Sequence, residues 1–184
     1  MKKHLVFLLL VLAVVSVGLF AENPKAIFNV VTDVPAIGDI KITDAPFAPD
    51  PVRRNSLSSI TPEFTGTHTV FQAGAQNLGK YISVLSNNRA GFTIKMSATA
   101  MKSPEFGAMV HDYIDYTVAA GEASITTDGA NVQAAQVVYS TPAKLTGLTF
   151  YSTGITLTVE ENSFHDALAG EGYQGTVTFE YFTK

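Results

Sequence analysis

The sequence predicts an all-β protein, an antiparallel sandwich or barrel of about eight to ten short strands. Apolar and polar residues alternate in many short stretches, which is typical of half-buried strands. Turn-forming clusters, among them residues 87–91 and the pair Asp128-Gly129, separate these stretches. No long stretch shows the 3.6-residue periodicity of an amphipathic helix. Together these three observations favour two facing β layers.

The clearest alternation closes the chain, in residues 173–184. Its apolar side consists of Gly175, Val177, Phe179 and Tyr181. Its polar side consists of Thr176, Thr178 and Glu180. A strand with this pattern buries one face and needs a second layer to cover its aromatic side chains. We therefore interpret positions such as Phe179, and Ile155 in an earlier strand, as core rather than ligand pocket.

The remaining elements follow from the same pattern. Strands are expected over residues 26–34, 37–43, 65–71, 81–86, 91–100, 113–119, 145–151 and 154–160. The turn at 87–91 predicts a hairpin between 81–86 and 91–100. Residues 132–139 fit either a strand or a short helix. A short helix is expected over 163–169, capped by Ser163, with Asp166 near its positive end and Gly170 ending it.

The first residues have the order of a secretory signal peptide. A short basic start that includes Lys2 and Lys3 precedes an uninterrupted apolar run over residues 5–15, and small residues follow. We expect cleavage after Ala21, with cleavage after Gly18 as the alternative. The rival interpretation is a transmembrane anchor, for which the run is short. The chain is thus expected to be exported, to the periplasm, the cell surface or the medium.

Residues 22–184 have the length of one domain. The sequence has no cysteine, so this domain must be held by packing and sheet pairing without disulfides. Removal of Lys2 and Lys3 with the leader takes the formal net charge from −4 to −6. Arg53-Arg54 is the only adjacent basic pair that remains. Nucleic acid is therefore not expected as a partner. No second long apolar stretch follows the first, so no integral membrane segment is expected after cleavage.

Three stretches together resemble a known kind of secreted domain. They are S-N-N-R-A-G-F-T-I-K-M-S-A over 86–98, I-D-Y-T-V over 114–118, and A-G-E-G-Y-Q-G-T-V-T-F-E-Y over 169–181. Their order is similar to that in bacterial pilin-like and spore-coat-U-like domains. The resemblance implies an Ig-like β-sandwich, and a fimbrial or adhesive role in the cell envelope.

The resemblance also implies assembly by strand donation, a form of β-augmentation. The donated element would be residues 26–34, in which Ala26, Phe28, Val30 and Val34 share one side. The alternative is that this stretch pairs within its own domain. Many pilins carry a disulfide and this chain does not, which is a departure from the commonest class.

Tyr173 has a structural interpretation of its own. A tyrosine at the corner of a sandwich often sends its hydroxyl to a nearby backbone group and locks the loop. We expect this role for Tyr173.

No stretch of the sequence carries a recognisable catalytic motif. Nothing matches a nucleophile elbow, a zinc protease helix, a phosphate-binding loop or a dinucleotide fingerprint. A metal site built from His68, His111 and His165 is considered and not favoured, because scattered histidines are usually solvent-facing. Calcium at residues 160–162 or 128–129 is not favoured either, since the alternating acid spacing of a calcium loop is missing. We expect no enzyme, no cofactor and no metal.

Two classes of function remain open. The first is a structural or assembly subunit that acts through sheet edges, with copies of itself or other envelope proteins as partners. The second is a monomeric binding module for a carbohydrate or other small ligand. That module would use the long proline-rich loop over residues 44–62, because loops carry specificity on rigid sandwiches.

Overall fold

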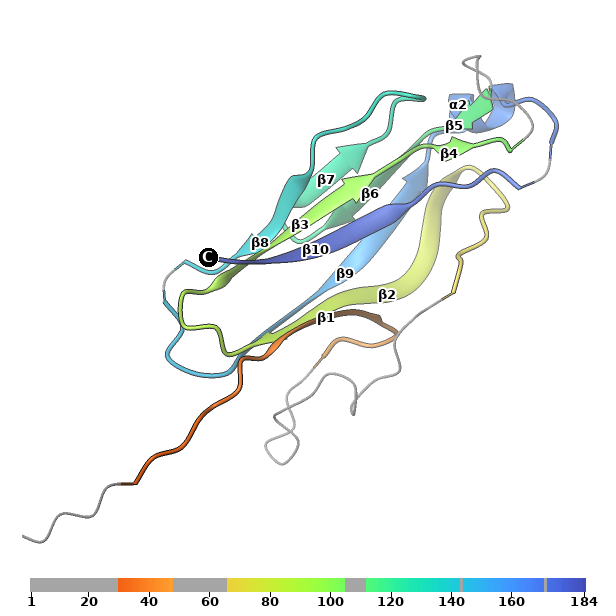
Figure 1. Cartoon of the computed structure of the whole chain (residues 1–184). Coiled ribbons are helices and arrows are strands. Elements are labelled where there is room, and N and C mark those ends of the chain that lie inside the picture. The colour runs from red at the N-terminus through yellow and green to blue at the C-terminus, as the bar shows by residue number, and fades with distance from the viewer. Residues whose placement is uncertain (1–29, 48–65, 105–111, 143, 171) are drawn as a thin grey trace, which may run out of the picture. The chain divides into compact units, whose positions relative to one another are not determined.

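The structure is a computed structural model that describes residues 30–47, 66–104, 112–142, 144–170 and 172–184 (Figure 1). In this part the chain forms two facing antiparallel sheets. The larger sheet has the order β1 (Gly38–Thr43), β2 (Gly74–Ser86), β9 (Thr149–Val159), β6 (Tyr116–Ala120) and β7 (Ala123–Thr126). The smaller sheet has the order β10 (Val177–Thr183), β3 (Phe92–Ala98) and β8 (Gln136–Ser140). The predicted all-β sandwich is confirmed.

A two-stranded sheet and the helix complete the described elements. Strands β4 (Met101–Lys102) and β5 (Tyr113–Ile114) pair with each other near α2 (Glu161–Asp166), at the end of the sandwich away from the C-terminus (Figure 1). The predicted single short helix is confirmed, although it begins at Glu161 and ends at Asp166, before Gly170. Asp166 is therefore its last residue and does not lie near its positive end. Its N-cap is Glu160, not Ser163. The Ser163 hydroxyl is instead an acceptor for the backbone N–H of Asp115, at 2.8 Å, so it ties the helix to the sheet.

The core lies between the sheets and follows the predicted alternation. Strand β3 buries Phe92, Ile94 and Met96 on its inner face. Strand β6 meets them from the other sheet with Tyr116 and Val118. A period of two on each facing strand suffices to fill this layer, without disulfides.

The predicted hairpin between 81–86 and 91–100 is wrong. Strand β2 pairs with β1 and β9 in the large sheet, whereas β3 pairs with β10 and β8 in the small one. The turn at 87–91 therefore crosses from one sheet to the other. The buried faces of β2 and β3 meet across the core instead of lying side by side in one sheet.

Several other boundaries differ from the sequence expectation. The two strands expected over 145–151 and 154–160 are one strand, β9, which runs through Gly154. Strand β2 begins at Gly74, earlier than expected, and β7 was not predicted. Residues 132–139, ambiguous by pattern, contribute to β8.

Two expected strands are not formed in their described parts. Residues 30–34 of the stretch 26–34 carry no strand, so the alternative of local pairing is wrong for these residues. Residues 66–71 of the stretch 65–71 carry none either. Both stretches alternate like a β-strand, but in their described parts neither is paired with another strand.

Residues 35–184 form one compact unit. The expected leader over 1–21 and most of the loop 44–62 lie outside the described residues. Within the described residues, no helix is long and apolar enough to span a membrane.

Candidate functional site

The two sheets differ in width, which leaves one side of the sandwich incomplete. Neighbouring strands are spaced by about 4.8 Å, so a five-stranded sheet is about 10 Å wider than a three-stranded one. On one side the edge strands β7 and β8 meet: the backbone N–H of Glu122 donates to the carbonyl of Val138 at 3.1 Å. The shortfall therefore falls on the opposite side, between β10 and β1. We call this side the open seam.

At one end the open seam is closed by Tyr181. Its hydroxyl lies 2.8 Å from that of Ser86, at the end of β2. Its ring stacks on Phe92, with centroids 5.5 Å apart. A β-carbon on Gly38 would lie 3.1 Å from the same ring, so a glycine here lets β1 approach β10 without a shift of the Tyr181 ring.

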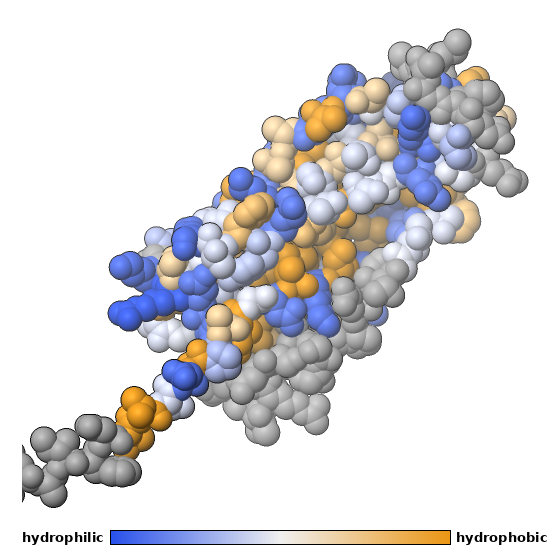
Figure 2. Space-filling model, viewed as in Figure 1, coloured by the Kyte–Doolittle hydropathy of each residue, from blue (hydrophilic) through white to orange (hydrophobic). Residues whose placement is uncertain are grey.

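Beyond Tyr181 the seam opens into an apolar groove of about 550 Å³. Its floor is the inner face of the large sheet, which presents Val118, Ile155 and Leu157. Its walls come from the two edges, with Ile42 on β1 and Val177 and Phe179 on β10. Figure 2 shows apolar side chains gathered between β10 and the pair β1 and β2. Five of these six residues are only half-buried, whereas Val118 is buried.

One rim of the groove carries charge. Lys80 lines the groove and forms an ion pair with Asp44, just after β1. Because both side chains are solvent-accessible, this pair contributes little to stability. It marks the border between the apolar floor and the solvent.

The backbone of β10 adds hydrogen-bonding groups to the groove. Thr99 donates its N–H to the carbonyl of Thr176, and Lys184 donates to that of Gly91. In and beside β10, the even-numbered residues therefore point their backbone groups at β3. By alternation, the backbone groups of Val177, Phe179 and Tyr181 point to the free edge of the sheet. These are also the residues whose side chains face inward.

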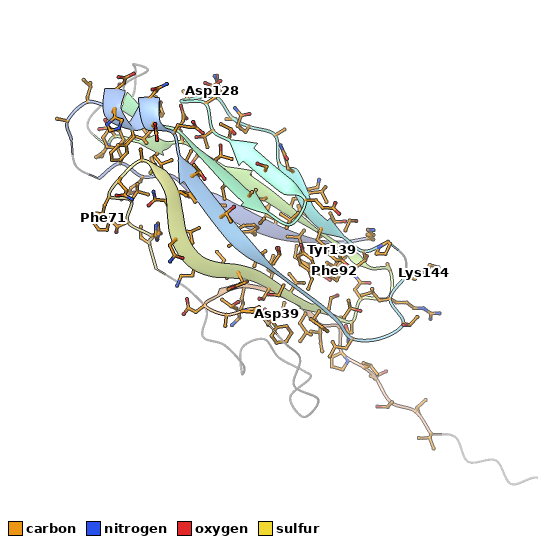
Figure 3. The ribbon with its side chains drawn as sticks, turned by 180° about the vertical axis from the view of Figure 1, so that it is seen from behind. Asp39, Phe71, Phe92, Asp128, Tyr139 and Lys144 are labelled. Atoms are coloured by element: carbon orange, nitrogen blue, oxygen red, sulfur yellow. The ribbon has the colours of Figure 1, made fainter. Side chains whose placement is uncertain are left out.

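A second cavity of about 480 Å³ adjoins the groove near α2. The two cavities share Thr67, His68, Val70, Met101, Tyr173 and Gln174. Phe164 of α2 lines the far part. Figure 3, seen from behind, places the labelled Phe71 close to this end of the sandwich, and Phe92 and Tyr139 close to the other.

The expected role of Tyr173 matches its contacts. Its hydroxyl donates to the carbonyl of Leu168 at 2.9 Å, so it ties the chain before β10 to the residues after α2. Its ring packs against the core and lines both cavities. The corner therefore also shapes one end of the groove.

Burial raises the pKa of two tyrosines. Tyr116, at the floor of the groove, has its pKa raised to about 12 because its phenol is desolvated. Its hydroxyl donates to the carbonyl of Thr99 at 2.8 Å, across the sandwich. Burial likewise raises the pKa of Tyr151, whose ring stacks on Tyr139 with centroids 4.0 Å apart. Both groups are structural hydrogen-bonding or packing residues in this arrangement.

Two of the three histidines considered for a metal belong to the described residues. His68 lines the groove, His165 lies on α2 against Phe164, and His111 is outside the described residues. Asp128 hydrogen-bonds Asn131 within its own turn. Among the described residues, no group of three or more potential ligands could hold a metal ion.

Sequence reasoning missed the groove. Ile155 and Phe179 were interpreted as plain core, yet both line the groove while packing against the core. Their alternation shows that one face is apolar, but it does not show whether a facing strand covers that face.

No protein-family model, curated protein or solved structure matches this chain. The site alone therefore carries the functional argument. It defines a β-sandwich with an apolar groove bordered by an unpaired strand edge.

Proposed function

We propose that this protein is a non-enzymatic assembly subunit of the bacterial envelope, whose open seam accepts a β-strand from another copy of the chain. The inserted strand would hydrogen-bond to the free edge of β10 and cover the floor of the groove. One observation carries the proposal. Strand β10 lines the apolar groove with its side chains, and the same residues point their backbone groups outward, to the edge of the sheet.

Edge protection supports β10 as the acceptor. Natural sheets blunt their edges with charges, short strands or bulges. In the described sheets, β1 carries Asp39 and Lys41, β7 has four residues, and the pairing of β8 with β3 shifts register. Strand β10 carries one charged residue, Glu180, has seven residues and pairs with β3 without any shift. It also has no proline, so its edge is suited to accept another strand.

The stretch 26–34 supports the choice of donor. Its described part leaves three valines in solvent, with Val30 79% exposed, Val31 93% and Val34 78%. Exposed apolar side chains at this density indicate a surface that is covered in another state. The alternation places Phe28, Val30 and Val34 on one side with Ala26 and Thr32, and it places Asn29 and Asp33 on the other with Ile27 and Val31. The first side has the aromatic residue and a single polar residue, so it is the better suited to the groove.

Export fits this role. The expected leader over residues 1–21 would bring the chain across the inner membrane, where subunits of surface structures assemble. Strand donation also needs no disulfide, which agrees with the absence of cysteine.

The test uses two neighbouring valines of opposite parity. The chain from Glu22 onward is compared with Val30→Asp and Val31→Asp on a sizing column with light scattering. We expect the parent and Val31→Asp to form a ladder of oligomers. Val30→Asp should be monomeric, because its carboxylate would be buried in the apolar groove. A peptide of residues 26–34 should bind the Val30→Asp monomer.

Three outcomes separate the alternatives. A monomeric parent that does not bind the peptide contradicts strand donation and favours a small-ligand module. Equal loss of oligomers in both variants contradicts the assigned parity. Deletion of residues 22–34 should abolish the ladder, and added peptide should stabilise the shortened chain.

A further inference from the structure

Residues 66–71, here called the strap, occupy one end of the groove without forming a strand. Their sequence alternates, with Gly66, His68 and Val70 on one side and Thr67, Thr69 and Phe71 on the other. Yet no backbone hydrogen bond joins the strap to another described residue. The strap therefore has the sequence pattern of a β-strand, but it is not paired with a described strand.

Among its contacts with other described residues, a single side chain anchors the strap in the core. Val70 is half-buried and packs against the core, whereas the five other strap residues are exposed. Phe71, the next residue, is 84% exposed. Segments with few buried contacts and no backbone pairing open at low free-energy cost. The strap is therefore held in place weakly.

The strap lies where the two cavities meet. Thr67, His68 and Val70 line both of them, together with Tyr173 and Gln174. A strand that continued along the groove past Val177 would reach these same residues. The strap and the far end of such a strand compete for one site.

The lengths favour this competition for the proposed donor. The edge of β10 from Val177 to Tyr181 offers five residues, about 17 Å. The nine residues 26–34 extend over about 30 Å. Since Tyr181 closes the near end, a donor that stayed in the groove over its whole length would extend toward Tyr173 and the strap.

We propose that the strap is a built-in placeholder, which covers the far end of the groove in the unassembled subunit and is displaced by the incoming strand. This inference rests on the proposed strand addition. The strap would keep Tyr173 and the adjoining cavity covered before assembly, and its weak anchoring would let a strand replace it.

The test measures binding of a fluorescently labelled peptide of residues 26–34 to the Val30→Asp chain, by anisotropy. In this background Val70→Ser removes the anchor, and Phe71→Ser changes the neighbouring exposed residue as a matched control. We expect Val70→Ser to bind the peptide about three- to tenfold more tightly, the factor that a partly buried valine supports. Phe71→Ser should bind like the parent.

The outcomes distinguish the two proposals. If no variant binds the peptide, strand addition itself is wrong. If the peptide binds, but Val70→Ser binds equally or more weakly, the strap is part of the acceptor and not a placeholder.

The methyl NMR signals of Val70 give a readout that needs no strap variant. On saturating the Val30→Asp chain with peptide, these signals should move to the positions of a solvent-exposed valine, while deuterium uptake falls over β10. Unchanged Val70 signals, with protection of β10, would overturn the displacement while leaving strand addition intact.

Discussion

The hydroxyl groups of Tyr181 and Ser86 lie 2.8 Å apart and join the small sheet to the large one at the closed end of the open seam. No strand covers this side of the described sandwich, so a side-chain bond holds the two edges together. The groove begins where this contact stops. The stability of this side of the sandwich therefore depends on a few specific residues, and substitution of these residues can test it.

Removal of the Tyr181 hydroxyl should destabilise the fold. We expect Tyr181→Phe to lower the free energy of unfolding by about 1 kcal/mol, because Ser86 loses one of its two hydrogen-bond partners and keeps only the N–H of Asn88, while the ring still stacks on Phe92. Urea unfolding in the Val30→Asp background, where we expect monomers, would measure it. Thr178→Ser, on the exposed side of the same strand, should stay within about 0.5 kcal/mol of the parent. Equal effects of the two changes would contradict the assigned bond.

Gly121 should tolerate no side chain. It has a φ of +56°, and an added β-carbon would lie 2.5 Å from both the Val138 carbonyl oxygen and the Tyr151 hydroxyl. Gly79 has a nearly equal φ of +55° with nothing within 4 Å, so it isolates the cost of the backbone conformation. We expect Gly121→Ala to cost about 1–3 kcal/mol more than Gly79→Ala in urea unfolding. Similar costs would mean that the contact between the β6–β7 turn and β8 can shift to make room for the added β-carbon.

Tyr173 should stabilise the corner through both its hydroxyl and its ring. Tyr173→Phe loses the bond to the carbonyl of Leu168, and we expect the melting temperature to fall by about 2–4 °C. Tyr173→Ala should fall further, since the ring packs against the core. An unchanged melting temperature in Tyr173→Phe would show that the hydroxyl does not lock the loop.

Alkaline pH should weaken the fold through Tyr116. Its pKa is raised from 10.0 to about 12 by burial, so the unfolded chain loses this proton at lower pH than the folded one. The stabilisation that the protonated Tyr116 phenol gives the folded state is fully present below pH 10 and is lost as pH rises through 12.

Urea unfolding at several pH values between 9 and 11.5 would measure this loss, as a free energy of unfolding that falls with rising pH. Tyr116→Phe should be less stable at neutral pH, because it lacks the bond to Thr99, but should show a shallower decline. The same decline in both proteins would assign the effect to other groups.

The face of each strand could be read from the sequence. Val177, Phe179 and Tyr181 lie inward and Thr178 and Glu180 outward, as their alternation predicts. The pairing could not be read in the same way. The turn at 87–91 was interpreted as a hairpin and instead links the two sheets.

The groove was beyond sequence reasoning for the same reason. Ile155 and Leu157 have the pattern of core residues, and they became a groove floor only because the facing sheet has fewer strands. The described valines of the stretch 26–34 likewise carry a strand pattern without a strand.

By itself, then, the sequence determined an all-β chain, the inward side of its strands and one short helix. Alternation encodes these features locally, residue by residue, through the cost of exposing apolar surface. Only the tertiary structure decided which strands are neighbours, how wide each sheet is and where the sandwich stays open. Those features depend on contacts between residues far apart in the chain, and no local pattern specifies them.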